Sequence, residues 1–168
     1  MIRNLDTLEK RFDGIARLDI QRAVAAGIKT VQAEAKARCP TDNGELKHSI
    51  FTDVEQDDDK TIGTCYTNKK YAVFVEMGTG PKGQQNHSDI SPDANPVYHQ
   101  GPWWIHESQI DKRVAERSHW FYIDTPQGRF YQCLGQRAHP YMYPALHDNR
   151  DLVLKQMSDV ISGQIRST

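Results

Sequence analysis

The chain has 168 residues, of which 38% are hydrophobic and 26% are charged, and its formal net charge at pH 7 is −1. This length suits one domain with a single apolar core. The near-neutral charge argues against a protein whose main partner is bare nucleic acid, because such proteins carry basic stripes. No apolar run approaches the roughly 20 residues that a membrane-spanning helix needs, and the first residues lack the core of a signal peptide. We therefore expect a soluble protein that is made in the cytoplasm.

Residues 4–38 have the periodicity of helices. Apolar side chains recur there every three or four positions: Leu8, Phe12, Ile15, Ile20, Val24, Ile28, Val31 and Ala35. Gly14 separates a short first helix from a second that begins near Arg17. Gly27 lies inside the apolar stripe, although glycine costs about 1 kcal/mol there relative to alanine. Pro40 ends the second helix, because the residue before a proline is disfavoured in the α region.

Residues 40–67 are predicted to form a turn and then a β-hairpin. Proline and glycine in 40–44 favour a tight turn. The first strand is predicted over 45–54, where alternate residues share one face: Leu46, His48, Ile50, Thr52 and Val54. The acidic run 55–59 forms the hairpin tip, and 61–67, rich in β-branched and aromatic residues, forms the return strand.

Residues 71–80, YAVFVEMGTG, are predicted to form an apolar turn or a short helix that ends at glycine. The apolar side chains of 71–77 are expected to point towards the core. Gly78 is expected to adopt the left-handed conformation, which glycine reaches without a Cβ clash.

Residues 81–118 contain many turn-forming residues and are predicted to be a long loop insertion, with a helical turn or two in 107–117. A loop of this length in a compact domain is functional or disordered. We expect it to be mobile in the free protein and to become ordered against a partner.

The remaining elements complete an α+β domain. A second hairpin is predicted from 120–123 and 129–134, and a last helix over 143–164 with Pro144 in its first turn. Its apolar face is predicted to comprise Leu146, Val153, Met157, Val160, Ile161 and Ile165. The expected fold is a long N-terminal helix and a C-terminal helix packed on a small antiparallel β-sheet. We expect a single domain over 1–168, with a variable insertion at about 81–118.

The candidates for catalysis and metal binding are weak. The seven histidines form no H-x-x-x-H or H-E-x-x-H pair, so converging metal ligands are not indicated. Cys39, Cys65 and Cys133 are odd in number and include no C-x-x-C, which is typical of reduced thiols. The glycines of 78–83 lack the order of a phosphate-binding loop, and the acidic run 55–59 lacks the spacing of a calcium loop. We therefore predict no catalytic residues, cofactor or metal.

The most informative surface candidates are the two tryptophans in the Pro/Gly-rich stretch, Trp103 and Trp104. Exposed tryptophan is favoured at interfaces, where it fills pockets of the partner. Aromatic residues on the second hairpin are more often explained by sheet packing. Together with Glu76, Gly78 and Thr79, the two tryptophans are our candidate interface residues.

Three blocks resemble the tail-component family typified by gene product 10 of phage HK97. Residues 39–50, CPTDNGELKHSI, resemble its P-x-D-x-G-x-L-x-x-S-I segment after an alanine-rich helix, and residues 71–79 resemble its Y-A-x-x-V-E-x-G-T segment. His139-Pro140 and 143–146, YPAL, resemble its P-F-x-x-P-A-L entry to the final helix. The blocks come in the family's order, with the insertion as the main departure.

This resemblance implies a structural virion protein of a tailed phage or prophage, not an enzyme. It implies a tail-completion or head–tail joining role in the neck, as a ring of six copies that contacts other neck proteins, the tail terminator or the tail tube. Neither a specific nucleic-acid sequence nor a membrane is implied as partner, and assembly in the host cytoplasm is expected. Two alternatives stay open: a small phage-encoded hydrolase or nuclease, which needs His, Asp or Glu side chains gathered in one cleft, and a monomeric adaptor for a host protein.

Overall fold

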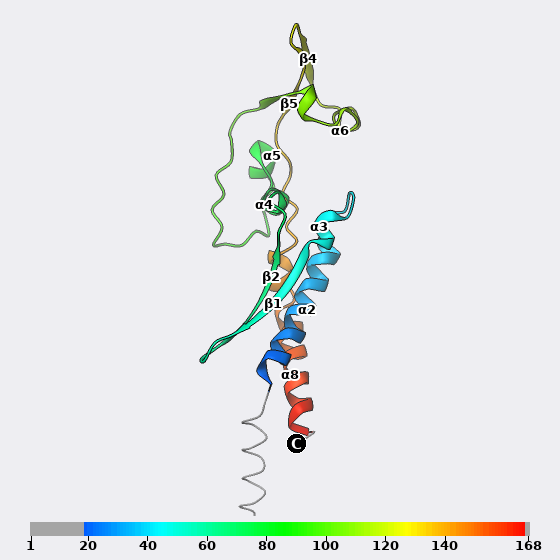
Figure 1. Cartoon of the computed structure of the whole chain (residues 1–168). Helices are drawn as coiled ribbons and strands as arrows, with labels where there is room; N and C mark the ends of the chain where they lie inside the picture. The colour runs from blue at the N-terminus through cyan, green and yellow to red at the C-terminus, as the bar shows by residue number, and fades with distance from the viewer. Residues whose placement is uncertain (1–18, 167–168) are drawn as a thin grey trace, which may run out of the picture. The chain divides into compact units, whose positions relative to one another are not determined.

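The computed structural model describes residues 19–166, and its chain divides into two compact units. The first unit comprises residues 1–69 and 141–168, and the second comprises Lys70–Pro140 (Figure 1). The expectation of one domain with a variable insertion stays a prediction. The helical pattern predicted over residues 4–18, with Leu8, Phe12 and Ile15, lies outside the described residues.

The first unit is organised around helix α2, Ile20–Arg38, which packs against a β-hairpin and against the C-terminal helices. The Asp19 carboxylate caps its start by accepting a hydrogen bond from the Arg22 N–H at 2.9 Å. Its end at Arg38, with Cys39 extended ahead of Pro40, confirms the predicted stop. The buried residues follow a four-residue period through small side chains: Ala23, Gly27, Val31 and Ala35.

Gly27 is explained by the close approach of the C-terminal helix. A Cβ atom at Gly27 would lie 2.8 Å from Met157 Cγ and 3.1 Å from Val153 Cγ1. Gly27→Leu is therefore expected to destabilise the first unit by about 1–2 kcal/mol, since overpacking outweighs the gain in helix propensity. Gly163→Ala, where a Cβ would meet nothing within 4 Å, should stabilise it by up to about 1 kcal/mol. Thermal unfolding followed by far-UV circular dichroism at 222 nm measures the melting temperature of both variants. Equal shifts of the melting temperature in the two variants would contradict this explanation of Gly27.

The hairpin consists of β1, Ile50–Gln56, and β2, Thr61–Thr67, in antiparallel register with Ile50 opposite Thr67. This confirms the predicted tip and return strand. The predicted start of the first strand at residue 45 is wrong, because 45–48 form a one-turn helix, α3, Glu45–His48. The Asn43 side chain accepts from the Glu45 N–H, and the Ser49 N–H bonds back to the carbonyls of the turn. These local hydrogen bonds compete with strand geometry.

The two faces of the hairpin differ. Side chains of Ile50, Thr52, Val54 and Cys65 are buried or half-buried, and β1 and β2 pack on α2. The opposite face carries exposed Phe51, Ile62 and Tyr66, with the rings of Phe51 and Tyr66 6.0 Å apart. The alternation predicted for one buried face is thus confirmed from Ile50 onwards, while the outer face is exposed and combines these three apolar side chains with Asp53, Glu55 and Thr64.

The predicted C-terminal helix is interrupted. It comprises α7, Tyr143–His147, with Pro144 in its first turn, and α8, Arg150–Arg166. Asp148 forms an ion pair with Arg38 at 3.0 Å, and the Asn149 side chain donates to the Ala145 carbonyl. The side chains of Asp148 and Asn149 thus form contacts that compete with the hydrogen bonds of a continuous helix, and the helix is interrupted here. Leu146 and Ile165 of the predicted apolar face are exposed, whereas Val153, Met157, Val160 and Ile161 are half-buried.

The second unit begins with two short helices and also contains a three-stranded antiparallel sheet. The first helices are α4, Ala72–Met77, and α5, Gly80–Gln84. The sheet has the order β3-β5-β4 and is formed by Trp103–His106, Gly128–Cys133 and Tyr122–Thr125, respectively. Between β3 and β4 lie η1, Glu107–Gln109, and α6, Lys112–Arg117.

These elements correct the picture of residues 81–118 as one loop. The longest stretch without helix or strand is 85–102, and Trp103 and Trp104 lie in a strand opposite Cys133 and Gln132. That pairing joins segments some 30 residues apart, so local sequence patterns do not reveal it. The helical turns within 107–117 are confirmed, and so is the second hairpin, although its first strand spans Tyr122–Thr125 and not the predicted 120–123. Mobility of the segment stays a prediction.

The expected burial of residues 71–77 is also corrected. In α4 the buried side chains are Ala72 and Glu76, four residues apart on one face, and Glu76 is 9% exposed. Val73 and Phe74 are exposed, because they lie off the buried face of this six-residue helix. The α+β class with a long N-terminal and a C-terminal helix is confirmed. Within residues 19–166 no helix is both long and apolar enough to cross a bilayer.

Candidate docking surface

The second unit contains an apolar pocket of about 680 Å³. Its walls come from α4, the start of α5, the coil before β3 and β3 itself. They consist of Val73, Phe74, Met77, Gly78, Thr79, Gly80, Pro96, Val97, Tyr98, His99 and Trp103. No Asp, Glu, Lys or Arg lines it, so this apolar pocket suits apolar side chains better than a charged ligand.

Gly78 lets the chain turn sharply at the base of the apolar pocket. Its φ of 73° confirms the predicted positive φ, but its ψ of −179° lies outside the left-handed helical region, in a region that only glycine occupies readily. Thr79 then pairs with the returning chain, donating its N–H to the Gln136 carbonyl at 2.9 Å and accepting from the Gln136 N–H at 3.1 Å. This backbone ladder holds the pocket wall in place.

The coil of 96–99 is held against α4 by its aromatic residues. The Tyr98 hydroxyl donates to the Met77 carbonyl at 2.7 Å, which closes one side of the apolar pocket. The His99 ring meets Trp103 edge-on, with centroids 5.8 Å apart. Partial burial of the Tyr98 hydroxyl raises its pKa above the usual value.

The rim of the apolar pocket exposes large apolar side chains to solvent. Val97 is 99% exposed and Phe74 is 53% exposed. Scattered exposed hydrophobic residues are common, but a group of them around an apolar depression marks an interaction surface. The apolar pocket and this rim are therefore the best candidate for docking.

The predicted interface residues are only partly brought together. Gly78, Thr79 and Trp103 line the apolar pocket, but Glu76 lies on the buried face of α4. Trp104, 42% exposed, is not among the lining residues and has its ring 6.1 Å from that of Phe121. Sequence reasoning missed Val97 and Phe74. A valine between Pro96 and Tyr98 carries no periodic signal, and Phe74 lies in a segment whose apolar character indicated burial.

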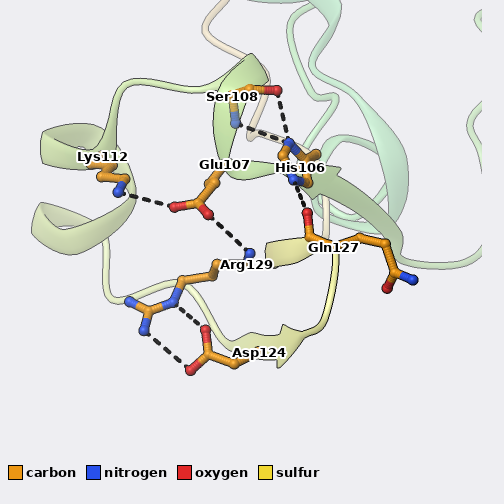
Figure 2. A network of polar contacts seen from close by, with 7 residues as sticks. All are labelled: His106, Glu107, Ser108, Lys112, Asp124, Gln127 and Arg129. Atoms are coloured by element: carbon orange, nitrogen blue, oxygen red, sulfur yellow. Dashed lines mark hydrogen bonds and ion pairs between the residues drawn. The ribbon is translucent and has the colours of Figure 1, made fainter.

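A polar network braces the other end of the second unit (Figure 2). The His106 Nε2–H donates to the Gln127 carbonyl at 3.0 Å, so Nδ1 accepts from the Ser108 hydroxyl at 2.8 Å. The Glu107 carboxylate accepts from the Lys112 ammonium and from the Arg129 N–H, away from the His106 ring. Each side chain is thus committed to a neighbouring turn or strand, an arrangement that stabilises the junction of β3, η1 and β5.

Asp124 and Arg129 complete this network by pairing across the β4–β5 hairpin. Two hydrogen bonds join them, of 2.7 and 3.2 Å, and the Arg129 guanidinium lies 3.9 Å from the centroid of the Tyr122 ring. The hydrogen bond from Arg129 holds the pKa of Asp124 below its ordinary value, and the hydrogen bond from Lys112 does the same for the pKa of Glu107.

These shifts predict the direction of the pH dependence. A carboxylate whose pKa is depressed by folding stabilises the fold at neutral pH, and this contribution is lost as pH falls through its folded pKa. The second unit should therefore lose stability as pH falls below the ordinary carboxylate pKa of about 4. Asp124→Asn should make this loss shallower, whereas Asp93→Asn, an exposed change in the coil, should not. Urea unfolding followed by tryptophan fluorescence at several pH values tests this, and identical profiles for Asp124→Asn and the parent would contradict it.

Metal-ligating side chains do not converge in the described part of the chain. Within residues 19–166, no group of three or more His, Cys, Asp and Glu side chains could hold a metal ion. Cys39 and Cys133 are buried and form no disulfide, and desolvation raises the pKa of the half-buried Cys65 thiol. The expectation that no metal or cofactor is bound stays a prediction.

Comparison with known families gives a match over the N-terminal part of the chain. Residues 1–78 match a family described as Bacteriophage HK97-gp10, putative tail-component. No curated protein and no solved structure matches the chain. The matched segment includes α2, the β1–β2 hairpin and α4, and it ends at Gly78 in the wall of the apolar pocket. The third block of the resemblance, 139–146, lies beyond it. The family indicated by the first two blocks is confirmed: residues 1–78 are similar to the phage tail components of the HK97 gp10 family.

Proposed function

We propose that this protein is a tail-completion or head–tail joining component of a tailed phage or prophage, which acts in the neck as a ring of six copies. A tail component is a structural part of the virion, so the family match over residues 1–78 supports a structural role and a virion location. In this proposal the ring contacts other neck proteins and the tail terminator or tail tube.

The observation that carries the proposal is the exposed rim of the apolar pocket, with Val97 and Phe74 open to solvent. Contiguous apolar surface of this kind is costly in water and is normally covered by a partner. In a closed ring each subunit makes a heterologous contact, which uses two different patches of its surface. The second patch that fits this requirement is the outer face of the β1–β2 hairpin, with Phe51, Ile62 and Tyr66.

Cryo-electron microscopy of particles from the encoding phage tests this function. We expect density for six copies in a ring at the neck, and virions that lack the gene product should show heads and tails that fail to join. Absence of the protein from particles, or its presence as a single copy, would rule out the ring and favour the adaptor.

A substitution at Val97 tests the role of the apolar pocket. Because Val97 is almost fully exposed, Val97→Asp should leave the unfolding free energy within about 0.5 kcal/mol of the parent. It should nevertheless reduce incorporation into particles at least about tenfold, since it introduces a charge into an apolar interface. Val114→Asp, the same change on α6 outside the pocket lining, is the control. Normal incorporation of Val97→Asp would exclude this surface from the assembly.

A further inference from the structure

A second depression of the same unit is polar and basic. It has a volume of about 670 Å³ and lies between α5 and the chain segment that follows β5. Its lining residues are Lys82, Gln85, Asn86, Gly135, Gln136, Arg137 and His139. None of these seven is acidic, so this basic pocket concentrates positive charge in a chain whose net charge is −1.

The basic side chains of this pocket are available to a ligand. Lys82, Arg137 and His139 are exposed, and none forms an ion pair with another residue of the described range 19–166. The amides beside them have structural roles: Gln136 Nε2 donates to the Phe74 carbonyl at 2.6 Å, and Asn86 Nδ2 donates to the Ala138 carbonyl at 3.4 Å. The positive charges of Lys82 and Arg137 therefore have no partner among these contacts. The ligand that complements them is an anionic oxygen group, either a carboxylate or a phosphate.

The chain itself offers carboxylates of this kind at the tip of the β1–β2 hairpin. Glu55, Asp57, Asp58 and Asp59 are exposed, against one lysine, Lys60. The turn is closed by hydrogen bonds between the backbones of Asp57 and Lys60, and the Asp57 carboxylate accepts from the Asp58 N–H. Asp58 and Asp59 therefore stand at the end of an ordered turn, which in Figure 1 is clear of the helices of its own unit.

We propose that the acidic hairpin tip of one copy docks into the basic pocket of a second copy of this chain. This inference rests on the proposed ring. Each copy carries one tip and one basic pocket, so the contact is heterologous and repeats from subunit to subunit, as ring closure requires. Carboxylates that meet an arginine fork and a lysine form charge-assisted hydrogen bonds, and like charges at the same place would repel, so the contact also sets the register of the subunits.

The phosphate of a nucleic acid is the other group that could supply anionic oxygens to the basic pocket. The observations favour the second copy, because the tip places several carboxylates on every subunit, and these carboxylates would repel DNA. Nucleic-acid-binding proteins usually have an extended stripe of basic residues, whereas this pocket has only three basic side chains. Phosphate binding is therefore an outcome that the experiment must be able to detect.

Charge reversal in the full-length chain tests the contact. The tip variant carries Asp58→Lys and Asp59→Lys, and leaves the turn-forming Asp57 in place. The pocket variant carries Lys82→Glu and Arg137→Glu. Each alone should be incorporated into particles at least about tenfold less than the parent, because attraction becomes repulsion. Co-expression of the two variants should restore incorporation, since each tip then meets a complementary pocket on its neighbour, and so should the chain with all four substitutions.

Matched controls on α8 separate this effect from a change in net charge. Asp151→Lys with Asp159→Lys repeats the charge change of the tip variant, and Arg150→Glu with Lys155→Glu repeats that of the pocket variant. All four residues are exposed, and both control chains should be incorporated within about twofold of the parent. Carbodiimide cross-linking of particles that contain equal amounts of ¹⁴N- and ¹⁵N-labelled chains should join Lys82 of one label to Asp58 or Asp59 of the other.

The outcomes distinguish this inference from the proposed function. If the parent protein is absent from particles or present as one copy, the ring itself is wrong. If the parent forms the ring and both reversal variants assemble normally, only the docking of the tip is overturned. If the four-substitution chain restores incorporation but co-expression of the two variants does not, the tip contacts the basic pocket within one chain and not between two copies. Loss of binding to a fluorescent DNA duplex in the pocket variant, with normal assembly of the tip variant, would assign the basic pocket to phosphate. Either result overturns the inference.

Discussion

Replacing Gly78 with valine is expected to lower the free energy of unfolding of the second unit by about 3–5 kcal/mol. The backbone at Gly78, with φ 73° and ψ −179°, is in a region that residues with a Cβ atom avoid. A Cβ atom there would also lie 2.6 Å from the Ala138 N and 2.8 Å from the Gln136 carbonyl oxygen. These neighbours are backbone atoms, which cannot rotate away, so crowding adds to a backbone strain of about 1–3 kcal/mol.

Thr79→Ala is the matched control for Gly78→Val. The Thr79 hydroxyl accepts a hydrogen bond from the Gln136 N–H at 3.1 Å, but this N–H also bonds to the Thr79 carbonyl. Removing the hydroxyl should therefore cost less than about 1 kcal/mol. All three tryptophans, Trp103, Trp104 and Trp120, belong to the second unit, so urea unfolding monitored by tryptophan fluorescence reports on that unit. A Gly78→Val midpoint equal to that of the parent, or a larger loss for Thr79→Ala, would refute this account of the turn.

Replacing Ile50 with alanine should destabilise the first unit by about 2–5 kcal/mol. Ile50 begins β1 and is 0% exposed, so truncation leaves a cavity as well as losing buried apolar surface. Its backbone carbonyl accepts a hydrogen bond from Gln32 Nε2 at 2.8 Å, which ties the strand to α2 and limits how far it can collapse into the cavity. The cavity should therefore persist.

Ile62→Ala is the same substitution on the other face of the hairpin, where Ile62 is 43% exposed. It should cost less than about 1 kcal/mol, because little buried surface is lost. Hydrogen exchange of amides in 50–67 measures both variants within the first unit. Equal protection in the two would show that the register assigned here, with Ile50 inward and Ile62 outward, is wrong. If the outer face is a ring contact, Ile62→Ala should still weaken incorporation into particles.

Local sequence determines several features of this protein. The stop of α2 at Pro40 follows from the φ/ψ restriction that proline places on its neighbour. The acidic turn and the alternation of β1 and β2 follow from a run too charged to bury between two β-prone segments. The positive φ of Gly78 follows from the need to turn directly after a short helix. Each of these depends on a few neighbouring residues, which is why the sequence is sufficient.

The candidate site was predictable only in part, because some of its residues depend on contacts that are not local in sequence. Gly78, Thr79 and Trp103 were identified, but Val97 and Phe74, which expose the most apolar surface at the rim, carry no local signal. Whether an apolar residue is buried depends on what packs against it, and here that is chain far away in sequence. The motifs indicated the tail-component family correctly over residues 1–78, because a family pattern is a property of the sequence itself.

Tertiary structure alone decided the features that depend on contacts between distant segments. Trp103 and Trp104 became strand residues because β5, some 30 residues later, supplied the hydrogen-bonding partner. Gly27, a weak point in an isolated helix, became a close contact because Met157 of α8 packs over it. Residues 45–48 became a helical turn because hydrogen bonds around Asn43 and Ser49 outweighed strand-like alternation. Sequence patterns predict which conformations a segment can adopt, whereas the partner that packs against it selects one of them.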